Sequence, residues 1–506
     1  MPTALLSVSE KTGLAAFARG LARMGYELFA TGSTLQALND AAVDARPVSE
    51  LTGFPEMMDG RIKTLHPGVH AGILARRDRP EHMAALSEHR LREIDLVCCN
   101  LYPFVSTVLR PDVTFEQAIE QIDVGGPAMI RAAAKNHESV VVVVRPERYS
   151  EILAGLSEGT LDAAARRRLA AEAFAHTSAY DAWIAAYMRG RNGFPPEITI
   201  AGQLAEPLKY GENEHQKAAF YRLGPDPGGL GGATQVHGGA PGFNNLQDAS
   251  AAIQLVSDYA QPAAAIIKHM NPCGLAVASE LATAYRMAYE CDKVSAFGGV
   301  VAVNRPLDRA TAEQIVQIVT HVVVAPEVLD EALPVLARRK NMVVLAAPPA
   351  HHGLLDYDVR SVPGGLLVQE WDRGTLDAST TKVVTRRAPD EAEWAQLRLA
   401  WIAVKHVKSN AIVLFREGAA VGVGAGQMSR VEAVQLAVLR AGDRSRGAVL
   451  ASDAFFPFAD GLQLAAQAGV TAVIQPGGSM RDDEVIAAAD AAGVAMVVTG
   501  RRHFRH

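Results

Sequence analysis

The feature that most constrains the fold is a regular alternation of apolar runs and helical patterns in the first 145 residues. The apolar runs, rich in aliphatic and β-branched residues, are TALLSV (3–8), YELFA (26–30), IDLVCCN (94–100) and SVVVVVR (139–145). A helical pattern over residues 11–24 separates the first two runs. Such alternation predicts βαβ units and a parallel sheet, and therefore an α/β fold for this part of the chain.

The length of the chain predicts more than one domain. A chain of 506 residues is too long for a single hydrophobic core. An Ala-rich helical stretch over residues 162–188 is followed by RNGFPPEITI (191–200), whose glycine and paired prolines end any helix. We therefore expect a first domain over residues 1–195 and a second over residues 200–506.

The second domain contains an apparent internal duplication. IIKHMNPCGLAVA (266–278) is echoed by AVKHVKSNAIVLF (403–415), and each is interpreted as an apolar strand that runs into Lys-His and then an Asn. SAFGGVVAV (295–303) and DAFFPFADG (453–461) fall at matching places in the two halves. The pattern predicts two related α/β subdomains, roughly 200–375 and 376–506, with their Lys-His loops near a shared crevice. Chance similarity between two apolar strands is the alternative.

Composition excludes several classes of partner. The net charge is -6 and no Lys/Arg-rich tract is present, so we expect no nucleic-acid partner. The N-terminal segment lacks a basic region and a long apolar run, and no stretch reaches the ~18 apolar residues of a membrane span. The four cysteines form no CxxC pair. We expect a protein of a reducing compartment, the cytoplasm, with no membrane contact.

Polar clusters follow the predicted strands of the first domain. Ligands of a parallel sheet bind beyond the carboxyl ends of its strands, where helix N-termini direct unpaired amides at anions. Hydroxyls, glycines and cations together suit a ribose phosphate, although any one of these residues taken singly is typically a helix cap. The candidates are Ser9, Lys11, Thr31, Gly32, Ser33, Thr34, Arg61, Lys63, Thr64, Asn100, Tyr102, Asp123 and Gly125.

Lys135 is a further candidate in the first domain. It lies in RAAAKNHES, an Ala-rich segment directly after the glycine turn QIDVGG. Lysines within helices are mostly solvated. Lys135 can donate or accept a proton in a reaction only if burial or a neighbouring cation such as Lys63 weakens its hold on that proton.

Long collinear motifs over the first 195 residues carry a family resemblance. SVSEKTGL, ATGSTLQAL, ELTGFPEMMDGRIKTLHPGVHAGILAR, CNLYPF and EQIDVGGPAMIRAAAKNH closely resemble the inosine monophosphate (IMP) cyclohydrolase domain of the bifunctional purine biosynthesis family. The resemblance implies a methylglyoxal-synthase-like fold. It also implies an activity, the closure of the formylated carboxamide ribonucleotide (FAICAR) to IMP with loss of water. It also implies that the polar clusters bind the nucleotide and that Lys135 transfers protons with support from Lys63, Tyr102 and Asp123. Holding both reacting groups on one clamped nucleotide supplies most of the catalysis, so no catalytic metal is expected.

A second constellation consists of Lys268, His269 and Asn410. Formyl transfer to an aromatic amine needs a base for the amine proton, a donor to the developing oxyanion and protonation of the leaving nitrogen. His269 suits a base, Asn410 can donate to an oxyanion and Lys268 adds positive charge. Alone, a Lys-His pair is a weak signal, because a single histidine is more often structural.

The second domain resembles the transformylase of the same family. PLKYGENEHQ, IIKHMNPCG, VSAFGG, VKSNA, GVGAGQMSR, DAFFPFADG, QPGGSMRD and RRHFRH are similar to the enzyme that formylates aminoimidazole carboxamide ribonucleotide (AICAR) with 10-formyltetrahydrofolate. The resemblance implies two cytidine-deaminase-like subdomains, a homodimer with sites across the interface, His269 as base, Lys268 as transition-state stabiliser and Asn410 as a folate and formyl contact. It further implies nucleotide contacts by Lys209, Tyr210, Gly298, Phe455 and Arg502, and folate contacts by Arg430, Val431, Asp460, Ser479 and Met480.

Some residues depart from the family pattern. Lys209 stands where arginine is frequent, and a lysine cannot make the same bidentate contact. His321 stands where some relatives carry an acidic residue. The phenylalanines at 455, 456 and 458 have a core interpretation as well as a ring-stacking one.

Other functions make different demands on the sequence. GVGAGQMSR does not meet the GxGxxG spacing, so no NAD site is expected. A zinc nucleoside deaminase needs a PCxxC pair, but residue 276, after Pro272 and Cys273, is alanine. A nucleotide-sensing module without catalysis would not need Lys135 or the Lys268–His269 pair.

Overall fold

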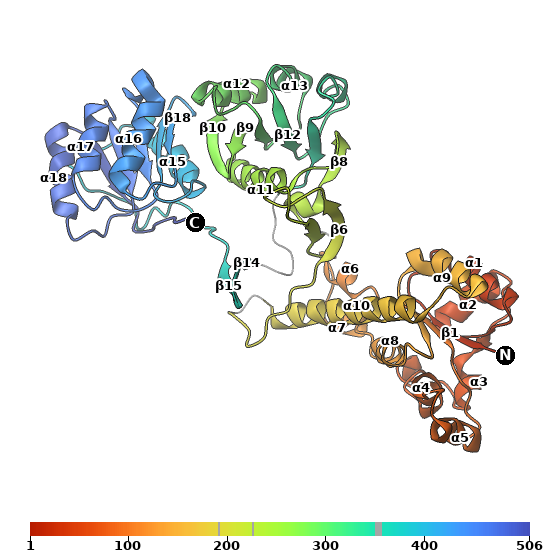
Figure 1. Cartoon of the computed structure of the whole chain (residues 1–506). Helices are drawn as coiled ribbons and strands as arrows, with labels where there is room; N and C mark the ends of the chain where they lie inside the picture. The colour runs from red at the N-terminus through yellow and green to blue at the C-terminus, as the bar shows by residue number, and fades with distance from the viewer. Residues whose placement is uncertain (191–192, 225–226, 350–356) are drawn as a thin grey trace. The chain divides into compact units, whose positions relative to one another are not determined.

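The computed structural model describes residues 1–190, 193–224, 227–349 and 357–506 (Figure 1). The chain separates into two compact units, Met1–Gly202 and Gln203–His506. No helix in the described ranges combines the length and apolar character needed to cross a bilayer.

The first unit contains a five-stranded sheet in which every pairing is parallel, so the predicted parallel sheet is confirmed. The strand order is β3-β2-β1-β4-β5. The strands are β1 (Thr3–Ser7), β2 (Glu27–Ala30), β3 (Arg46–Pro47), β4 (Leu96–Cys99) and β5 (Val141–Val143). The helices are α1 (Leu14–Arg23), α2 (Gly32–Asp40), α3 (Val48–Thr52), α4 (Pro67–Leu74), α5 (Pro80–Glu88), α6 (Phe104–Val108), α7 (Phe115–Glu120), α8 (Gly125–Lys135), α9 (Tyr149–Glu158) and α10 (Ala163–Arg189).

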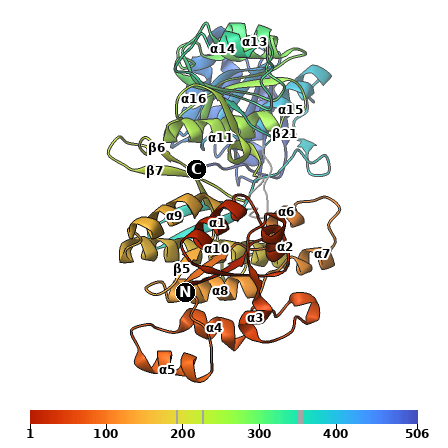
Figure 2. The same cartoon turned by 90° about the vertical axis from the view of Figure 1, so that its right-hand side faces the viewer.

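The long helix α10 is the Ala-rich helix expected from the sequence. It begins after Asp162, whose carboxylate accepts a hydrogen bond from the Ala165 amide at 2.7 Å and satisfies one of the unpaired donors of the first turn. Its buried alanines allow a close approach, and α10 packs against α8 and β5 (Figure 2). This packing fixes α8, whose N-terminus faces the first candidate site.

The second unit is built on one twelve-stranded sheet with the order β16-β21-β20-β19-β17-β18-β10-β9-β11-β12-β13-β8. Its strands are β8 (Thr234–His237), β9 (Ala263–Lys268), β10 (Asn271–Val277), β11 (Gly299–Val303), β12 (Thr320–Ala325), β13 (Val343–Ala346), β16 (Lys382–Val383), β17 (Ile412–Arg416), β18 (Ala419–Gly424), β19 (Val449–Ser452), β20 (Ala472–Gln475) and β21 (Ala495–Val498). Separate two-stranded hairpins are formed by β6 (Gln203–Leu208) with β7 (Ala218–Arg222), and by β14 (Tyr357–Val362) with β15 (Gly365–Glu370).

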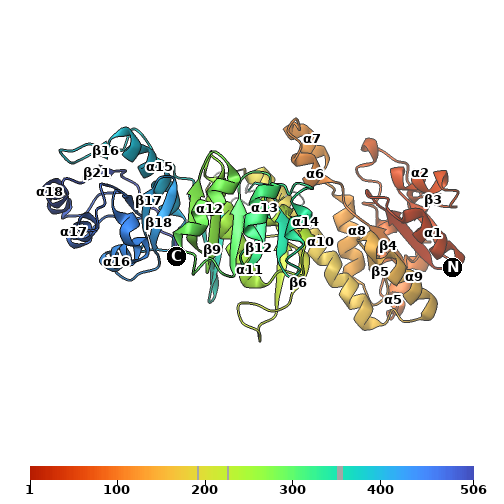
Figure 3. The same ribbon diagram turned by 90° about the horizontal axis from the view of Figure 1, so that it is seen from above.

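Helices cover both faces of this sheet. They are α11 (Phe243–Ser257), α12 (Leu281–Cys291), α13 (Arg309–Ile315), α14 (Leu333–Leu336), α15 (Glu391–Lys405), α16 (Arg430–Ala441), α17 (Asp460–Gln467) and α18 (Asp482–Ala492). In the half of the sheet that contains β9 to β13, α11 lies on one face, and α12 and α13 lie on the other (Figure 1 and Figure 3).

The two halves of the second unit repeat one topology. The succession α11-β9-β10-α12-β11-α13-β12-α14-β13 is matched by α15-β17-β18-α16-β19-α17-β20-α18-β21, and the strand orders β10-β9-β11-β12-β13 and β18-β17-β19-β20-β21 correspond. In each half an antiparallel hairpin is followed by parallel strands. The helix before the hairpin packs on equivalent strands in both halves.

The residue alignment expected for this repeat is wrong. The segment AVKH (403–406) is not a strand but the end of α15, with His406 as its C-cap. The strand equivalent to β9 is β17, and the turn equivalent to His269–Met270 is Glu417–Gly418. SAFGG comes before β11, whereas DAFFPF comes after β19. A short apolar run looks the same in a buried helix and in a buried strand, which is why sequence alone misplaced it.

Glycines mark the true correspondence. A side chain on Gly274 in β10 would collide with the carbonyl oxygen of Ala288 in α12, and one on Gly422 in β18 would collide with that of Ala437 in α16. In both halves a helix therefore lies directly on a glycine of the second hairpin strand.

A charged cluster around the buried His406 ties the ends of α11 and α15 together. Asp258 accepts a hydrogen bond at 2.6 Å from Lys405 Nζ and lies 2.6 Å from His406 Nε2. Burial lowers the pKa of His406 to about 4 despite this carboxylate. Burial alone would raise the pKa of Asp258, but the hydrogen bonds and charges of His406 and Lys405 lower it to about 2.

This cluster predicts that the second unit loses stability in acid. Between pH 6.5 and about 4 the unfolded state binds a proton at His406 that the folded state does not, so the free energy of unfolding falls by on the order of 3 kcal/mol as pH drops through this window. Below about pH 4, protonation of Asp258 in the unfolded state continues the loss. We expect His406→Gln to reduce the shift in urea midpoint between pH 7 and pH 5, followed by tryptophan fluorescence.

The matched control is His321→Gln, which replaces an exposed histidine and should leave the pH dependence of the wild type in place. An unchanged pH dependence in His406→Gln would contradict the assignment.

Candidate active sites

The first site is a cavity of about 590 Å³ at the carboxyl ends of β1, β2 and β4. Twelve of the residues predicted from strand-end clusters line it, namely Ser9, Lys11, Thr31, Ser33, Thr34, Arg61, Lys63, Thr64, Asn100, Tyr102, Asp123 and Gly125. The parallel sheet brings them together because its carboxyl ends share one edge.

Hydrogen bonds between strand ends fix the floor of this cavity. Asn100 Oδ1 accepts from the Ser9 amide at 2.6 Å and from the Glu10 amide at 3.0 Å. Thr34 Oγ1 accepts from the Val8 amide at 3.0 Å and donates to the Val8 carbonyl at the same distance. The loop after β1 is therefore clamped to the loops after β2 and β4.

The N-terminus of α2 offers unpaired amides to an anion. Thr31 occupies the N-cap position, but its hydroxyl makes no capping bond and lies instead 2.8 Å from the hydroxyl of Ser7. Lys11 Nζ donates to Ser33 Oγ at 3.2 Å and so brings a positive charge to the same place. Burial lowers the pKa of Lys11. Free amides, a helix dipole and a lysine together form a site for a phosphate.

Asp123 and Tyr102 form the titratable part of the cavity. Burial raises the pKa of Asp123 above its ordinary value, and the amides of Gly126 and Tyr102 together with the charge of Lys63 oppose this only in part. Burial and the nearby charge of Asp123 raise the pKa of Tyr102. Asp123 Oδ1 accepts from the Gly126 amide at 2.8 Å, so the carboxylate is fixed at the start of α8.

Two predicted residues of the first unit do not line this cavity. Gly32 faces an adjoining cavity of about 310 Å³ that shares Lys63 with the first. Lys135 is exposed at the last position of α8, about 15 Å along the helix axis from Gly125. A proton-transfer role for Lys135 stays a prediction, because the structure does not bring it to the cavity.

The second site lies at one edge of the twelve-stranded sheet. Strands β10 and β18 pair antiparallel, with Ala276 opposite Ala419, and join the two repeats. This pairing brings the β9-β10 turn to the same edge as the loops around Asn410. The Lys408 amide donates to Asn271 Oδ1 at 3.0 Å, which links the two segments directly.

Lys268 and His269 lie at this edge and are accessible. Lys268 is the last residue of β9, and its Nζ donates to the Phe297 carbonyl at 2.8 Å. His269 is exposed in the turn that follows. Gly298, next to Phe297, has φ +74°, and a side chain there would contact the ring of His321. Three predicted positions of the first repeat, Lys268, His269 and Gly298, are thus neighbours, and His321 adjoins them.

Asn410 is held by a buried ion pair that sequence reasoning did not assign. Arg430 Nη2 donates to Asn410 Oδ1 at 2.8 Å, and Arg430 Nη1 pairs with Asp453. Arg430 is 6% exposed and Asp453 is 0% exposed, so Arg430 positions Asn410 instead of facing solvent. Asn410 Nδ2 already donates to the Gln427 carbonyl at 2.9 Å. A contact from this amide to an oxyanion would require an exchange of that bond or of its 3.2 Å bond to the Met428 carbonyl.

The other predicted folate and nucleotide residues of the second repeat lie in loops or in first helical turns at the same edge. β19, β20 and β21 are parallel, and their carboxyl ends continue into the loops that contain Phe455, Ser479 and Arg502. Met480 is fully exposed, and Asp460 begins α17. Val431 follows Arg430 in the first turn of α16.

The three phenylalanines of DAFFPFADG divide between core and surface. Phe456 is 0% exposed and belongs to the core, whereas Phe455 and Phe458 are 39% and 48% exposed. A ring-stacking role therefore remains open only for the two exposed rings. The Arg481 guanidinium already lies 4.7 Å from the Phe458 ring centroid.

Lys209 and Tyr210 follow β6, in the connection to β7. Lys209 Nζ lies 5.3 Å from the Tyr210 ring centroid, a cation–π distance. Asn244 Nδ2 donates to the Glu212 carbonyl at 3.3 Å and ties this connection to the start of α11. The lysine is exposed and free to meet an anion.

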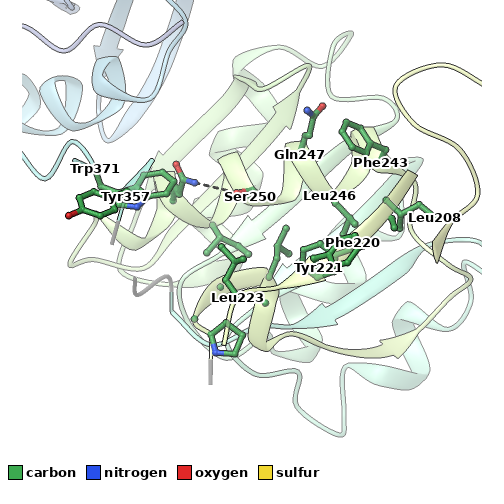
Figure 4. A pocket seen from close by; sticks show the side chains of 18 residues that line it. Leu208, Phe220, Tyr221, Leu223, Phe243, Leu246, Gln247, Ser250, Tyr357 and Trp371 are labelled. Carbon is green, nitrogen blue, oxygen red and sulfur yellow. Dashed lines mark hydrogen bonds between the residues drawn. The ribbon is translucent and has the colours of Figure 1, made fainter. Parts of the chain in front are cut away.

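A separate cavity of about 410 Å³ in the second unit is mostly apolar (Figure 4). Leu246, Phe220 and Leu223 contribute side chains to it, and Gln254 donates to Ser250 Oγ at 3.2 Å on its wall. None of the predicted site residues lines this cavity. Within the described ranges, no group of three or more His, Cys, Asp or Glu side chains is arranged to hold a metal ion.

Sequence reasoning missed the residues that position others. Asp453 holds Arg430, Tyr180 donates to the Gln121 carbonyl at 2.8 Å and accepts from the Asp123 amide at 2.9 Å, and Glu120 pairs with Arg61. Asp453 stands at the head of DAFFPFADG, so that motif was the available signal. Tyr180 lies within a long Ala-rich helix, where no local pattern distinguishes it.

An α/β protein with two separate polar sites, one beside a helix N-terminus that suits a phosphate, is thus defined by fold and geometry. The profile of the AICARFT/IMPCHase bienzyme family matches residues 133–440, and that of the MGS-like domain matches residues 13–128. The bifunctional purine biosynthesis proteins PurH of Roseobacter denitrificans, Chloroflexus aurantiacus and Bacillus subtilis are 53%, 52% and 48% identical to this chain, with 99% of it covered and 98%, 98% and 99% of theirs. The chain belongs to the AICARFT/IMPCHase bienzyme family, which combines AICAR formyl transfer and IMP ring closure.

The first cavity leaves no room for a larger side chain at position 125. A methyl group on this glycine would collide with the hydroxyl of Thr64, which is only 5% exposed and cannot retreat into solvent. We expect Gly125→Ala to weaken IMP binding to the full chain about 10-fold or more, measured by calorimetry. Gly239→Ala is the control because its surroundings are open and its backbone is not left-handed, and it should leave IMP binding unchanged. Wild-type affinity in Gly125→Ala would contradict the assigned cavity.

Proposed function

We propose that the first unit closes FAICAR to IMP in the cavity lined by Lys63, Tyr102 and Asp123. The observation that carries this proposal is the convergence of twelve independently predicted residues in one cavity. The phosphate binds at the N-terminus of α2 beside Lys11 and Ser33, and Arg61, Thr64, Asn100 and Gly125 enclose the rest of the nucleotide. Glu120, which pairs with Arg61 in the free protein, releases it to the ligand.

Ring closure forms a bond between the carboxamide nitrogen and the formyl carbon and then expels water. The carboxamide nitrogen and the formamide nitrogen each lose a proton, and the former formyl oxygen gains two protons before it leaves as water. Asp123 is buried enough to hold a proton more readily than an ordinary aspartate, and Tyr102 and Lys63 are donors beside it. Fixing both reacting groups on one nucleotide supplies proximity.

The second unit transfers the formyl group of 10-formyltetrahydrofolate to the 5-amino group of AICAR. His269 accepts the amine proton, Lys268 stabilises the negative charge that develops on the formyl oxygen when the amine attacks the formyl carbon, and the proton reaches N10 of the departing tetrahydrofolate. Lys209, Tyr210, Gly298, Phe455 and Arg502 bind the nucleotide. Asp460, Ser479, Met480 and Val431 bind the folate, while Arg430 orients Asn410.

The second site is completed by a second copy of the chain. It is an open edge, with Met428 96% exposed and Met480 fully exposed. Within the described part of the chain, the β14-β15 hairpin pairs with no other strand and exposes Leu366 and Leu367, and an isolated hairpin of this kind needs packing to be stable. A homodimer supplies that packing. All four cysteines are free, in keeping with a cytoplasmic enzyme.

Asp123→Asn tests the first assignment. It keeps the size of the side chain but removes its acid–base function, so we expect ring closure to slow about 100-fold or more, with FAICAR accumulating in a chromatographic assay. Formyl transfer in the same chain should be unchanged. Normal ring closure would exclude Asp123.

The Lys135→Ala variant tests whether the residues that line the cavity transfer the protons, or whether Lys135 does so, as the family resemblance implies. If the residues that line the cavity transfer the protons, FAICAR closure in this variant stays within about threefold of wild type, since Lys135 lies about 15 Å from Gly125 along α8. A loss comparable to that of Asp123→Asn would return the proton-transfer role to Lys135.

His269→Ala tests the second assignment. We expect formyl transfer to fall by about 100-fold or more because the amine proton has no acceptor, and the release of tetrahydrofolate measures this. Added FAICAR should still be converted to IMP at the wild-type rate. Loss of both activities in a folded variant would contradict separate sites.

A further inference from the structure

The β9-β10 turn that presents His269 has an unusual backbone. Its two central residues, His269 and Met270, have φ values of +54° and +64°, although neither is a glycine. Lys268 pairs with Asn271, so the turn is a two-residue hairpin connection. Two positive φ angles in such a turn are typical of sequences such as Asn-Gly, because side chains with a Cβ disfavour the left-handed region.

The second repeat contains the equivalent turn and shows which residues form it there. The equivalent connection between β17 and β18 is Glu417–Gly418, with φ values of +50° and +83°. It has glycine at the second position, where the first repeat has Met270. The first repeat therefore adopts the same backbone without the residue that makes it favourable.

Asp248 compensates for this difference. It lies in the second turn of α11, and its carboxylate accepts hydrogen bonds from both strained residues, from the His269 amide at 3.2 Å and from the Met270 amide at 2.6 Å. One carboxylate thus holds both amides of the turn. Among the residues that the structure describes, no side chain accepts a hydrogen bond from the Glu417 amide, and the Gly418 amide donates to Gln396 Oε1 at 2.9 Å.

We propose that Asp248 is a positioning residue for formyl transfer, which holds the turn in the conformation that aims His269 at the substrates. This rests on the proposed role of His269. Asp248 acts through the backbone of the turn and takes no part in proton transfer. Strain at a functional turn persists only where the surroundings over-determine it, and here the carboxylate supplies that constraint.

Asp248→Ala in the full chain should lower kcat for formyl transfer roughly 10- to 100-fold, because a small displacement of a catalytic group is enough for such a loss. Ring closure of added FAICAR, measured in the same preparation, should be unchanged. Asp308→Ala is the matched control, since Asp308 also binds a backbone amide, that of Thr311 at 2.7 Å, but far along the chain from the turn. It should not affect formyl transfer.

The decisive variant is Asp248→Ala combined with Met270→Gly. Glycine makes the positive φ favourable, as in the second repeat, so the double variant should recover at least tenfold over Asp248→Ala, and Met270→Gly alone should be active. Full activity of Asp248→Ala, or failure of glycine to restore it, would overturn the proposal. The His269→Ala variant tests the role of His269 separately from that of Asp248. If it retains formyl transfer, the proposed role of His269 is wrong, whatever the result for Asp248→Ala.

Discussion

The antiparallel pairing of β10 with β18 is the constraint on which the second unit depends. It joins the two repeats in opposite directions, with Ala276 opposite Ala419. The hairpin turn of the first repeat therefore reaches the edge of the sheet at which the second repeat places the carboxyl ends of β19, β20 and β21. Residues of the two repeats meet at this edge, although the first repeat contributes its hairpin turn and the second repeat contributes the carboxyl ends of its parallel strands. Without this reversal, Lys268 and Asn410 would lie at opposite edges.

The first unit also brings its site residues to one edge of a sheet, but parallel strands alone are enough to do so. Parallel strands place all their carboxyl ends on one side, and loops after β1, β2 and β4 form one cavity. Within this cavity, the residues that we propose to bind phosphate lie apart from Asp123. Lys11 and Ser33 lie at the start of α2, whereas Asp123 lies at the start of α8. Glycine at position 125 is required because Thr64 fills the space in front of it.

Much of this architecture could be predicted from the sequence, and the errors have physical causes. Apolar alternation predicted the parallel sheet, and twelve of the residues predicted from strand-end clusters line the first cavity. The duplication was correct in topology but misaligned, because residues 403–406 have the composition of a buried strand and form the end of a helix. Asp248 was not predicted because its partners are backbone amides, which leave no pattern in the sequence, whereas Asp453 stands in the DAFFPFADG motif but pairs with an arginine 23 positions earlier.

Two separate sites in one chain are the central claim, and mixing two variants tests it most directly. His269→Ala and Asp123→Asn chains are each supplied with AICAR and 10-formyltetrahydrofolate, alone and together, and IMP is followed by chromatography. Neither variant alone should form IMP at an appreciable rate, and the mixture should form it after a lag in which FAICAR passes from one protein to the other. A mixture as inactive as its components, with both proteins folded, would contradict independent sites.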